Sequence, residues 1–163
     1  MHLDPSKTYG SWNGAEITTF LQESRIPLRV SFMTKNGLLI VPIWFEYVAG
    51  QFIGCSPASS LLVTSLKQNP EVAFDLSTND LPYRGLRGRA LAHCSVAPNS
   101  TALEQLLVRY TGNTDNALAH ALLSREQEEA IIEFQITWLT SWDFSKRMDG
   151  LEKITSRLPD ISV

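Results

Sequence analysis

The chain has 163 residues, a formal net charge of −3, 44% apolar residues and 19% charged residues. This composition is typical of a globular protein, and it excludes a chain that is disordered throughout. No run of 18 apolar residues predicts a membrane-spanning helix, and we expect no secretion signal, because the start lacks a basic and an apolar region. The acidic balance argues against a dedicated nucleic-acid binder. Two cysteines, Cys55 and Cys94, form no paired motif and predict free thiols in a cytoplasmic protein.

The first residues, 1–12, are polar and predict a loose arm. A helix is expected over 14–24, because Asn13 can accept hydrogen bonds from its first turn. Apolar residues recur there at helical spacing, so the helix should bury one side against the rest of the chain.

Two segments rich in β-branched and aromatic residues, 26–34 and 38–48, predict a hairpin. Asn36-Gly37 lies between them and is typical of a tight turn in which both residues adopt positive φ. Ala49-Gly50 predicts a second turn, and 51–55 a third strand. Together these segments predict a three-stranded antiparallel meander.

The middle of the chain predicts one short helix and two strands. Ser59 and Ser60 can cap a helix that runs to about residue 68, where Asn69-Pro70 stops it. Strands are expected over 71–76 and 86–96, with a loop of Asn, Asp and Pro between them.

Two helices should precede the last strand. Thr101-x-x-Glu104 is typical of a capping box, Gly112 ends the first helix, and the second begins near Thr114 or Asp115. Alternating apolar residues predict a strand over 130–142, and the tail over 149–163 should be irregular. Six strands with flanking helices predict a mainly β (α+β) fold, a small antiparallel barrel that forms a single domain over 1–163.

The standard catalytic and metal-binding motifs are absent from the sequence, and the three histidines lack metal-ligand spacing. Three segments leave alternatives open. Ser56–Ser60 suits an anion site or a plain helix cap. Arg84–Arg89 suits phosphate or carboxylate recognition or a solvated strand face. Trp138–Met148 suits stacking on a flat ligand or a core tryptophan with surface basic residues.

In order along the chain, four segments resemble the FMN-binding split-barrel family of pyridoxamine 5'-phosphate oxidase. They are Arg29–Phe45 with its run Ile-Val-Pro-Ile-Trp-Phe, Phe52–Val72 with its ending Leu-x-x-Asn-Pro-x-Val, Pro82–Ala90, and Ser141–Arg147. The resemblance spans roughly 25–148. It implies a six-stranded split β-barrel of the Greek-key type that binds FMN.

The resemblance implies a flavin-dependent oxidoreductase that acts on a small molecule, as a homodimer with cofactor clefts between its subunits. The alternative is a non-catalytic split barrel that binds flavin, deazaflavin, FAD or haem, or that has lost its cofactor. The implied residues are Arg29, Val30 and Ser31 beside the flavin and its phosphate, Pro42, Ile43 and Trp44 along the isoalloxazine, Ser56, Ser59, Ser60 and Leu62 at the phosphate, Trp142 and Arg147 from the second subunit, and Arg84 near the interface.

The chain departs from the family at the phosphate site, where Leu61-Leu62 stands in place of the usual Arg-Lys. Each charge-assisted hydrogen bond lost to a phosphate removes about 1.5–3 kcal/mol. Arg29, Arg84 and Arg147 are the cations expected to compensate, together with helix amides. Without that compensation, the sequence predicts weak FMN binding or a different ligand.

Overall fold

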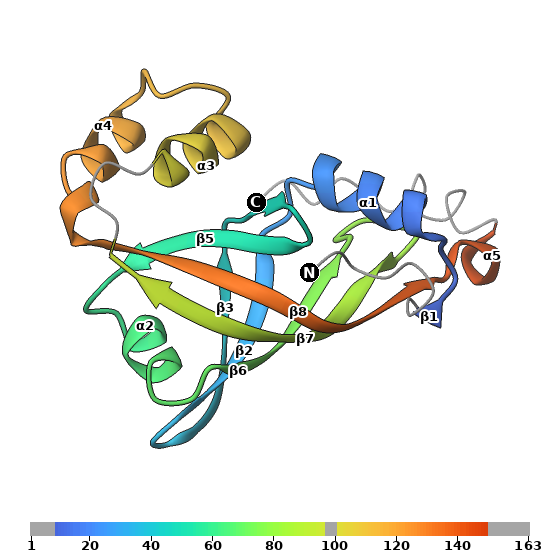
Figure 1. The fold of residues 1–163 in the computed structure, drawn as a ribbon. Helices are drawn as coiled ribbons and strands as arrows, with labels where there is room; N and C mark the ends of the chain where they lie inside the picture. Colours follow the sequence, from blue (N-terminus) through green and yellow to red (C-terminus); the bar gives the residue numbers. More distant parts are fainter. Residues whose placement is uncertain (1–8, 97–100, 150–163) are drawn as a thin grey trace, which may run out of the picture.

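The computed structural model describes residues 9–96 and 101–149, and Figure 1 shows their fold, a strongly curved sheet flanked by helices. The strands are β1 (Tyr9–Gly10), β2 (Leu28–Thr34), β3 (Gly37–Ile43), β4 (Glu46–Val48), β5 (Gln51–Pro57), β6 (Glu71–Ser77), β7 (Arg84–Ser95) and β8 (Glu129–Asp143). The helices are α1 (Gly14–Glu23), α2 (Leu61–Leu66), α3 (Ala102–Thr111), α4 (Ala117–Leu123) and α5 (Ser145–Met148), with a short 3₁₀ turn η2 (Glu126–Glu128). No helix of the described part is long and apolar enough to cross a membrane.

The strand order explains how the barrel is built. Seven strands follow one path, β3-β2-β6-β7-β8-β5-β4, and β1 pairs with β8 beside it. The two ends of this path, β3 and β4, are consecutive in the chain and are joined only by Trp44 and Phe45. The sheet therefore curls until its two edge strands meet through a covalent link, which leaves an opening beside that link.

The expected count of six strands is wrong, as is the expected meander. The predicted strand 38–48 is broken, because β3 pairs with β2 whereas β4 pairs with β5. Phe45 is fully buried in the main core and packs edge-on against Phe52, with ring centroids 5.1 Å apart. The neighbouring Trp44 packs instead on a second, smaller cluster. Two aromatic residues drawn to two different cores interrupt the strand.

The loose arm predicted over 1–12 is wrong for its described part. Tyr9 and Gly10 pair in parallel with Thr140 and Ser141. The Trp12 backbone amide then donates to Ser141 Oγ (2.9 Å), and its indole nitrogen donates to Asp143 (3.0 Å). Residues 1–8 and 150–163, with the rest of the arm and nearly all of the predicted tail, lie outside the described residues.

The predicted first hairpin is confirmed, but its predicted turn is wrong. Lys35 and Asn36 form the turn, and only Gly37 there has positive φ (112°). Thr34 Oγ1 accepts from the Asn36 amide and donates to the Gly37 carbonyl, at 3.1 and 2.8 Å, which fixes this geometry. The pair of positive φ values occurs instead in the Ala49-Gly50 turn.

The predicted caps of the first two helices are confirmed. Asn13 and Glu16 form a capping box on α1, and the Ser60 side chain caps α2. Thr101 makes no side-chain cap bond, because its backbone is not extended, so the capping box predicted there is wrong. The helix expected to begin near Thr114 or Asp115 begins at Ala117, and Asn116 caps it.

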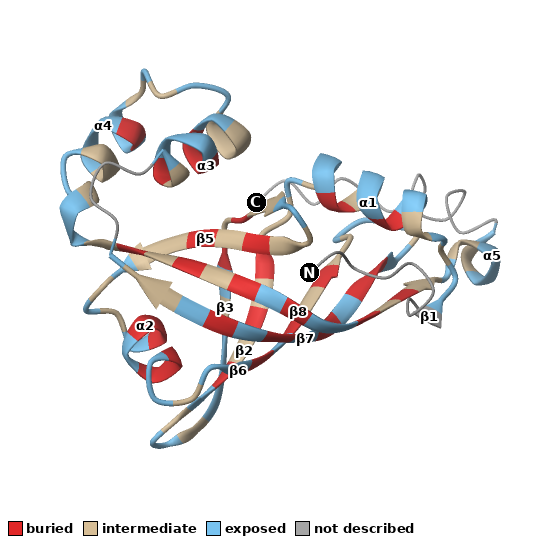
Figure 2. Cartoon of the chain, viewed as in Figure 1, coloured by how far each residue is buried: buried red, intermediate tan, exposed pale blue. Residues whose placement is uncertain are grey.

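The main core fills the concave side of the sheet. Buried residues recur at alternate positions along β7 and β8, as red bands separated by blue or tan ones in Figure 2. The largest fully buried side chains include Phe32, Phe45, Phe52 and Phe134. A second cluster, centred on Leu103, Leu107 and Ala119, joins α3 and α4 to β5.

Candidate functional site

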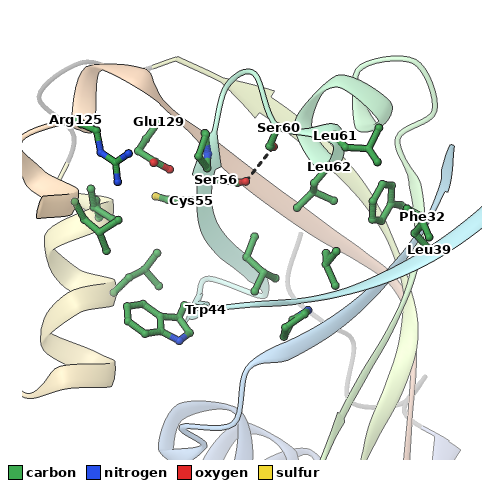
Figure 3. A pocket seen from close by; sticks show the side chains of 17 residues that line it. Phe32, Leu39, Trp44, Cys55, Ser56, Ser60, Leu61, Leu62, Arg125 and Glu129 are labelled. Carbon is green, nitrogen blue, oxygen red and sulfur yellow. Dashed lines mark hydrogen bonds between the residues drawn. The ribbon is translucent and has the colours of Figure 1, made fainter. Parts of the chain in front are cut away.

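A pocket of about 560 Å³ lies where the barrel is split (Figure 3). Apolar side chains of β2, β3, α2, α3 and α4 form most of its wall. These include Phe32, Leu39, Val41, Leu61, Leu62, Leu103, Leu106 and Leu122. Its floor runs along β3 into the break before β4, so the connection that closes the barrel also shapes the pocket.

The indole of Trp44 forms the aromatic part of the wall. It stacks on Tyr110 of α3, with ring centroids 4.8 Å apart and planes 5° from parallel. The Tyr110 hydroxyl accepts from the Phe45 amide at 3.3 Å and contacts the Ile26 carbonyl oxygen at 3.4 Å. Burial raises the pKa of Tyr110, so its hydroxyl stays protonated at neutral pH. Trp44 is therefore held by α3 as well as by the connection between β3 and β4.

Two serines line the pocket where β5 leads into α2. Ser56 Oγ donates to Ser60 Oγ at 3.1 Å, and Ser60 Oγ also accepts from the Val63 amide as the helix cap. Both hydroxyls thus already have partners within the chain. The next two residues, Leu61 (58% exposed) and Leu62 (7% exposed), contribute apolar surface.

The polar end of the pocket holds Cys55, Arg125 and Glu129, which Figure 3 shows grouped opposite Leu61 and Leu62. Burial, helped by the negative charge of Glu129, raises the pKa of Cys55 to about 12. Burial also raises the pKa of Glu129, while the charge of Arg125 opposes that shift. The thiol is therefore neutral at physiological pH.

Within the described residues, no three His, Cys, Asp or Glu side chains are grouped as a metal site. The site is a largely apolar pocket with an aromatic wall and a small polar end. Such a pocket suits a flat organic molecule better than an ion.

No family model and no curated protein sequence matches the chain. Solved structures do match. A conserved hypothetical protein from Mycobacterium tuberculosis has a TM-score of 0.71 at 20% identity, covering 94% of this chain and 92% of that one. An F420 reductase has a TM-score of 0.62 at 21% identity, covering 73% and 92%. A candidate pyridoxamine 5'-phosphate oxidase from Listeria innocua has a TM-score of 0.57 at 8% identity, covering 78% and 95%.

The chain has the pyridoxamine 5'-phosphate oxidase-like split-barrel fold. The same fold occurs in a FAD-binding protein from Mesorhizobium loti (TM-score 0.54, 12% identity). It also occurs in HutZ, the haem storage protein of Vibrio cholerae (TM-score 0.59, 16% identity). The predicted resemblance is thus confirmed at the level of the fold.

The split barrel brings six of the predicted site residues together in the pocket. They are Pro42, Ile43, Trp44, Ser56, Ser60 and Leu62. Pro42 lies on β3, an edge strand of the path. Proline is tolerated on an edge strand because its missing N–H costs the sheet no hydrogen bond there. This group comes from the two strands and the helix start that the sequence motifs marked.

Four other predicted residues of the split barrel lie elsewhere. The Arg29 guanidinium contacts Asp75 at 3.1 Å and Asn79 at 2.6 Å, on the outer face of the sheet. Ser31 lies on that same face. Val30, between them, is fully buried in the main core, and Ser59 is exposed and does not line the pocket.

Three predicted residues gather at the opposite end of β7 and β8. Arg84 opposes Asp143 in the ladder, and Gly85 opposes Trp142. The Trp142 ring lies 5.0 Å from that of Phe144, and the Arg147 guanidinium lies 5.1 Å from the same Phe144 ring. None of the three lines the pocket of its own chain.

Sequence reasoning missed the polar end of the pocket and its helical wall. The missed residues are Cys55, Leu103, Leu106, Leu122, Arg125 and Glu129. A usable signal existed for Glu129, since an antiparallel pair between the third and last predicted strands places it opposite Pro57, beside the serines. The helical residues carried no such signal, because their stripe is equally typical of a core.

Proposed function

We propose that this protein is a flavin-dependent oxidoreductase that binds FMN in the pocket at the split of the barrel and acts on a small molecule. The observation that carries the proposal is the pocket itself, in which the Trp44 ring and apolar side chains enclose a space of about 560 Å³. This volume lies within the range of pockets that hold small organic molecules. The likeness in fold to an F420 reductase and a FAD-binding protein favours a flavin-type ligand.

The residues present fit the ring of such a cofactor. Pro42, Ile43 and Trp44 would lie along the ring, and Leu62 with the leucines of α3 would exclude water from it. When bound, FMN supplies the hydride and electron transfer, so the protein needs only to orient it and to shield it from solvent. This division of roles agrees with a pocket that holds few titratable groups.

The proposal includes a homodimer in which a second copy brings Trp142 to the cleft, with Arg84 and Arg147 at the interface outside the pocket. Two observations support it. The three residues gather at one end of the sheet, away from the pocket at the split of their own barrel, and the outer face of the sheet exposes large apolar side chains. Those side chains are Met33, Leu38, Ile40, Leu91 and Trp138.

The visible spectrum of the purified protein tests the proposal. We expect flavin absorption bands and about one flavin per chain, and bleaching when NADPH or NADH is added without oxygen. Trp44→Leu should weaken FMN binding, whereas Val108→Ala on the exposed side of α3 should not. A colourless protein whose spectrum does not change on titration with FMN contradicts the proposal.

A second candidate function is a non-catalytic split barrel that binds flavin, deazaflavin, FAD or haem. The observation that favours it is Leu61-Leu62, which gives the start of α2 two apolar side chains and no cation. HutZ, a haem storage protein, has the same fold, which supports haem as one of the possible ligands. A haem absorption band, or a bound flavin that neither nicotinamide donor bleaches, would favour this candidate.

A further inference from the structure

The charge of the pocket does not suit a phosphate. Among the described residues that line it, Arg125 is the only cation and Glu129 the only carboxylate. One positive and one negative side chain leave no net attraction for a dianion. Of the two serine hydroxyls, Ser56 donates to Ser60, and Ser60 Oγ accepts both that bond and the bond from the Val63 amide, so one O–H is left to donate to a ligand.

Arg125 and Glu129 face the same space without neutralising each other. In the part of the chain that the structure describes, neither forms an ion pair within 4 Å. Arg125 Nε donates to the Ala121 carbonyl at 3.4 Å, while the two terminal guanidinium nitrogens make no hydrogen bond with described residues. Figure 3 shows both side chains reaching toward the pocket beside Cys55.

The backbone holds this pair in place. Glu129 opposes Pro57 at the end of the β5–β8 ladder, and the Ala58 amide donates to the Glu128 carbonyl at 2.7 Å. Arg125 lies four residues earlier, between α4 and η2, so both side chains start from fixed points beside the turn that carries Ser56 and Ser60. A free donor and a free acceptor are thus presented side by side.

A donor beside an acceptor matches the edge of an amide or imide. Arg125 can donate to a ring carbonyl, and Glu129 can accept from the adjacent ring N–H. Such an edge is uncharged, so it needs no net charge from the pocket. The neutral Cys55 thiol next to the pair adds no charge that would disturb this match.

We infer that the pocket recognises its ligand by the imide edge of a flat ring, through Arg125 and Glu129, and gains little from a phosphate. The inference rests on the proposed function, because flavin and deazaflavin rings both carry such an edge. It adds the group that is recognised, and it predicts that riboflavin, which lacks the phosphate, binds about as tightly as FMN.

Binding of FMN, riboflavin, lumichrome (the ring without its side chain) and 3-methylriboflavin tests the inference. We expect dissociation constants of FMN and riboflavin within about threefold of each other, and a loss of about tenfold or more for 3-methylriboflavin, whose imide N–H is blocked. Arg125→Met and Glu129→Met should each weaken the binding of riboflavin, also by about tenfold or more. Glu128→Met, one residue away and exposed, is the matched control.

The outcomes separate this inference from the proposed function. FMN that binds more than about tenfold tighter than riboflavin overturns the inference and leaves the flavin enzyme intact. That result would mean that cations such as Arg84 or Arg147 of a second copy reach the phosphate. Lumichrome binding that depends on Arg125 and Glu129, without reduction of any bound flavin, upholds the inference and contradicts the oxidoreductase. Failure of all four rings to bind overturns both.

Discussion

The indole of Trp44 and the phenol of Tyr110 lie face to face, 4.8 Å apart and 5° from parallel. The two residues come from the break between β3 and β4 and from α3, which are far apart in the sequence. Their stack therefore ties the helical wall of the pocket to the connection that closes the barrel. Arg109, the neighbour of Tyr110, strengthens the tie by donating to the Leu21, Gln22 and Ser24 carbonyls at the end of α1.

Two substitutions at Tyr110 should distinguish the contribution of the ring stack from the contribution of the hydroxyl. Tyr110→Phe keeps the ring and loses the bond from the Phe45 amide, which should lower the free energy of unfolding by about 1 kcal/mol. Tyr110→Ala also removes the stack and leaves a gap against Trp44, for a loss of about 3 kcal/mol. Urea unfolding measures both values, and FMN titration should show weaker binding only for Tyr110→Ala. Equal losses in the two variants would contradict a role for the stack.

Alanine at either of two glycines, Gly88 and Gly112, should destabilise the protein, but for different physical reasons. A Cβ on Gly88 would meet the Trp138 carbonyl oxygen and the Phe74 ring, so Gly88→Ala should lose about 3 kcal/mol or more. Gly112 ends α3 at a φ of 84° with open space around it, so Gly112→Ala should lose only about 1 kcal/mol. Thermal unfolding measures the difference.

Gly112→Asn is the control for the second site, because asparagine tolerates a left-handed conformation. It should unfold within a few degrees of the unaltered protein. If Gly88→Ala is as mild as Gly112→Ala, then β7 and β8 do not approach as closely as the structure indicates.

The fold was largely predictable from the sequence because alternation and turn residues act locally. The break at Trp44-Phe45 was not, since it depends on a second cluster that forms only when Tyr110 and α3 arrive. The hydrogen bond from Trp12 to Asp143 was missed too, because the short polar arm has no periodic pattern of apolar residues that would predict its position. Both errors come from contacts between residues distant in the chain.

The site was predictable only where a motif marked it. Pro42 and Ser56 lie on recognisable strands, Trp44 directly follows one, and all three line the pocket. Arg29 carries a charge that suits a phosphate, yet Asp75 holds it on the outer face, and no local pattern indicates that pairing. Arg125, the cation that does line the pocket, lies in a helical insertion outside the four segments that resemble the family.

The Cys55 thiol should make stability depend on pH in alkaline solution. Its pKa is raised from 9.0 to about 12 in the folded protein, chiefly by burial. Between those values the unfolded thiol ionises and the folded thiol does not, so its contribution is complete below pH 9 and is lost as the pH rises toward 12. The loss is at most about 1.4 kcal/mol for each pH unit.

Urea unfolding of the unaltered protein and of Cys55→Ala at pH 8, 9.5 and 10.5 measures this contribution. As the pH rises, the unfolding free energy of the unaltered protein should fall relative to that of Cys55→Ala, because only the unaltered protein carries the thiol. Other titrating groups cancel, since both chains share them. A difference that stays constant over this range would contradict a neutral, buried Cys55.

The outer face of the sheet should carry the contact between two copies. A hollow of about 670 Å³ there is lined by Ser31, Met33, Leu38 and Arg89 among others, and the nearby Ile40 side chain is 69% exposed. Several large apolar side chains exposed on one face are typical of a protein interface.

Ile40→Glu places a charge in that contact. The free energy needed to bury an unpaired carboxylate exceeds the free energy gained from an apolar contact. We expect light scattering after size-exclusion chromatography to show about twice the 18.2 kDa chain mass for the unaltered protein and one chain mass for Ile40→Glu. Val108→Glu, on the exposed side of α3, should remain dimeric. Because β3 also borders the pocket, the monomeric variant should bind FMN more weakly if a second copy completes the cleft. If the unaltered protein has the mass of one chain at every concentration measured, the proposed homodimer is contradicted.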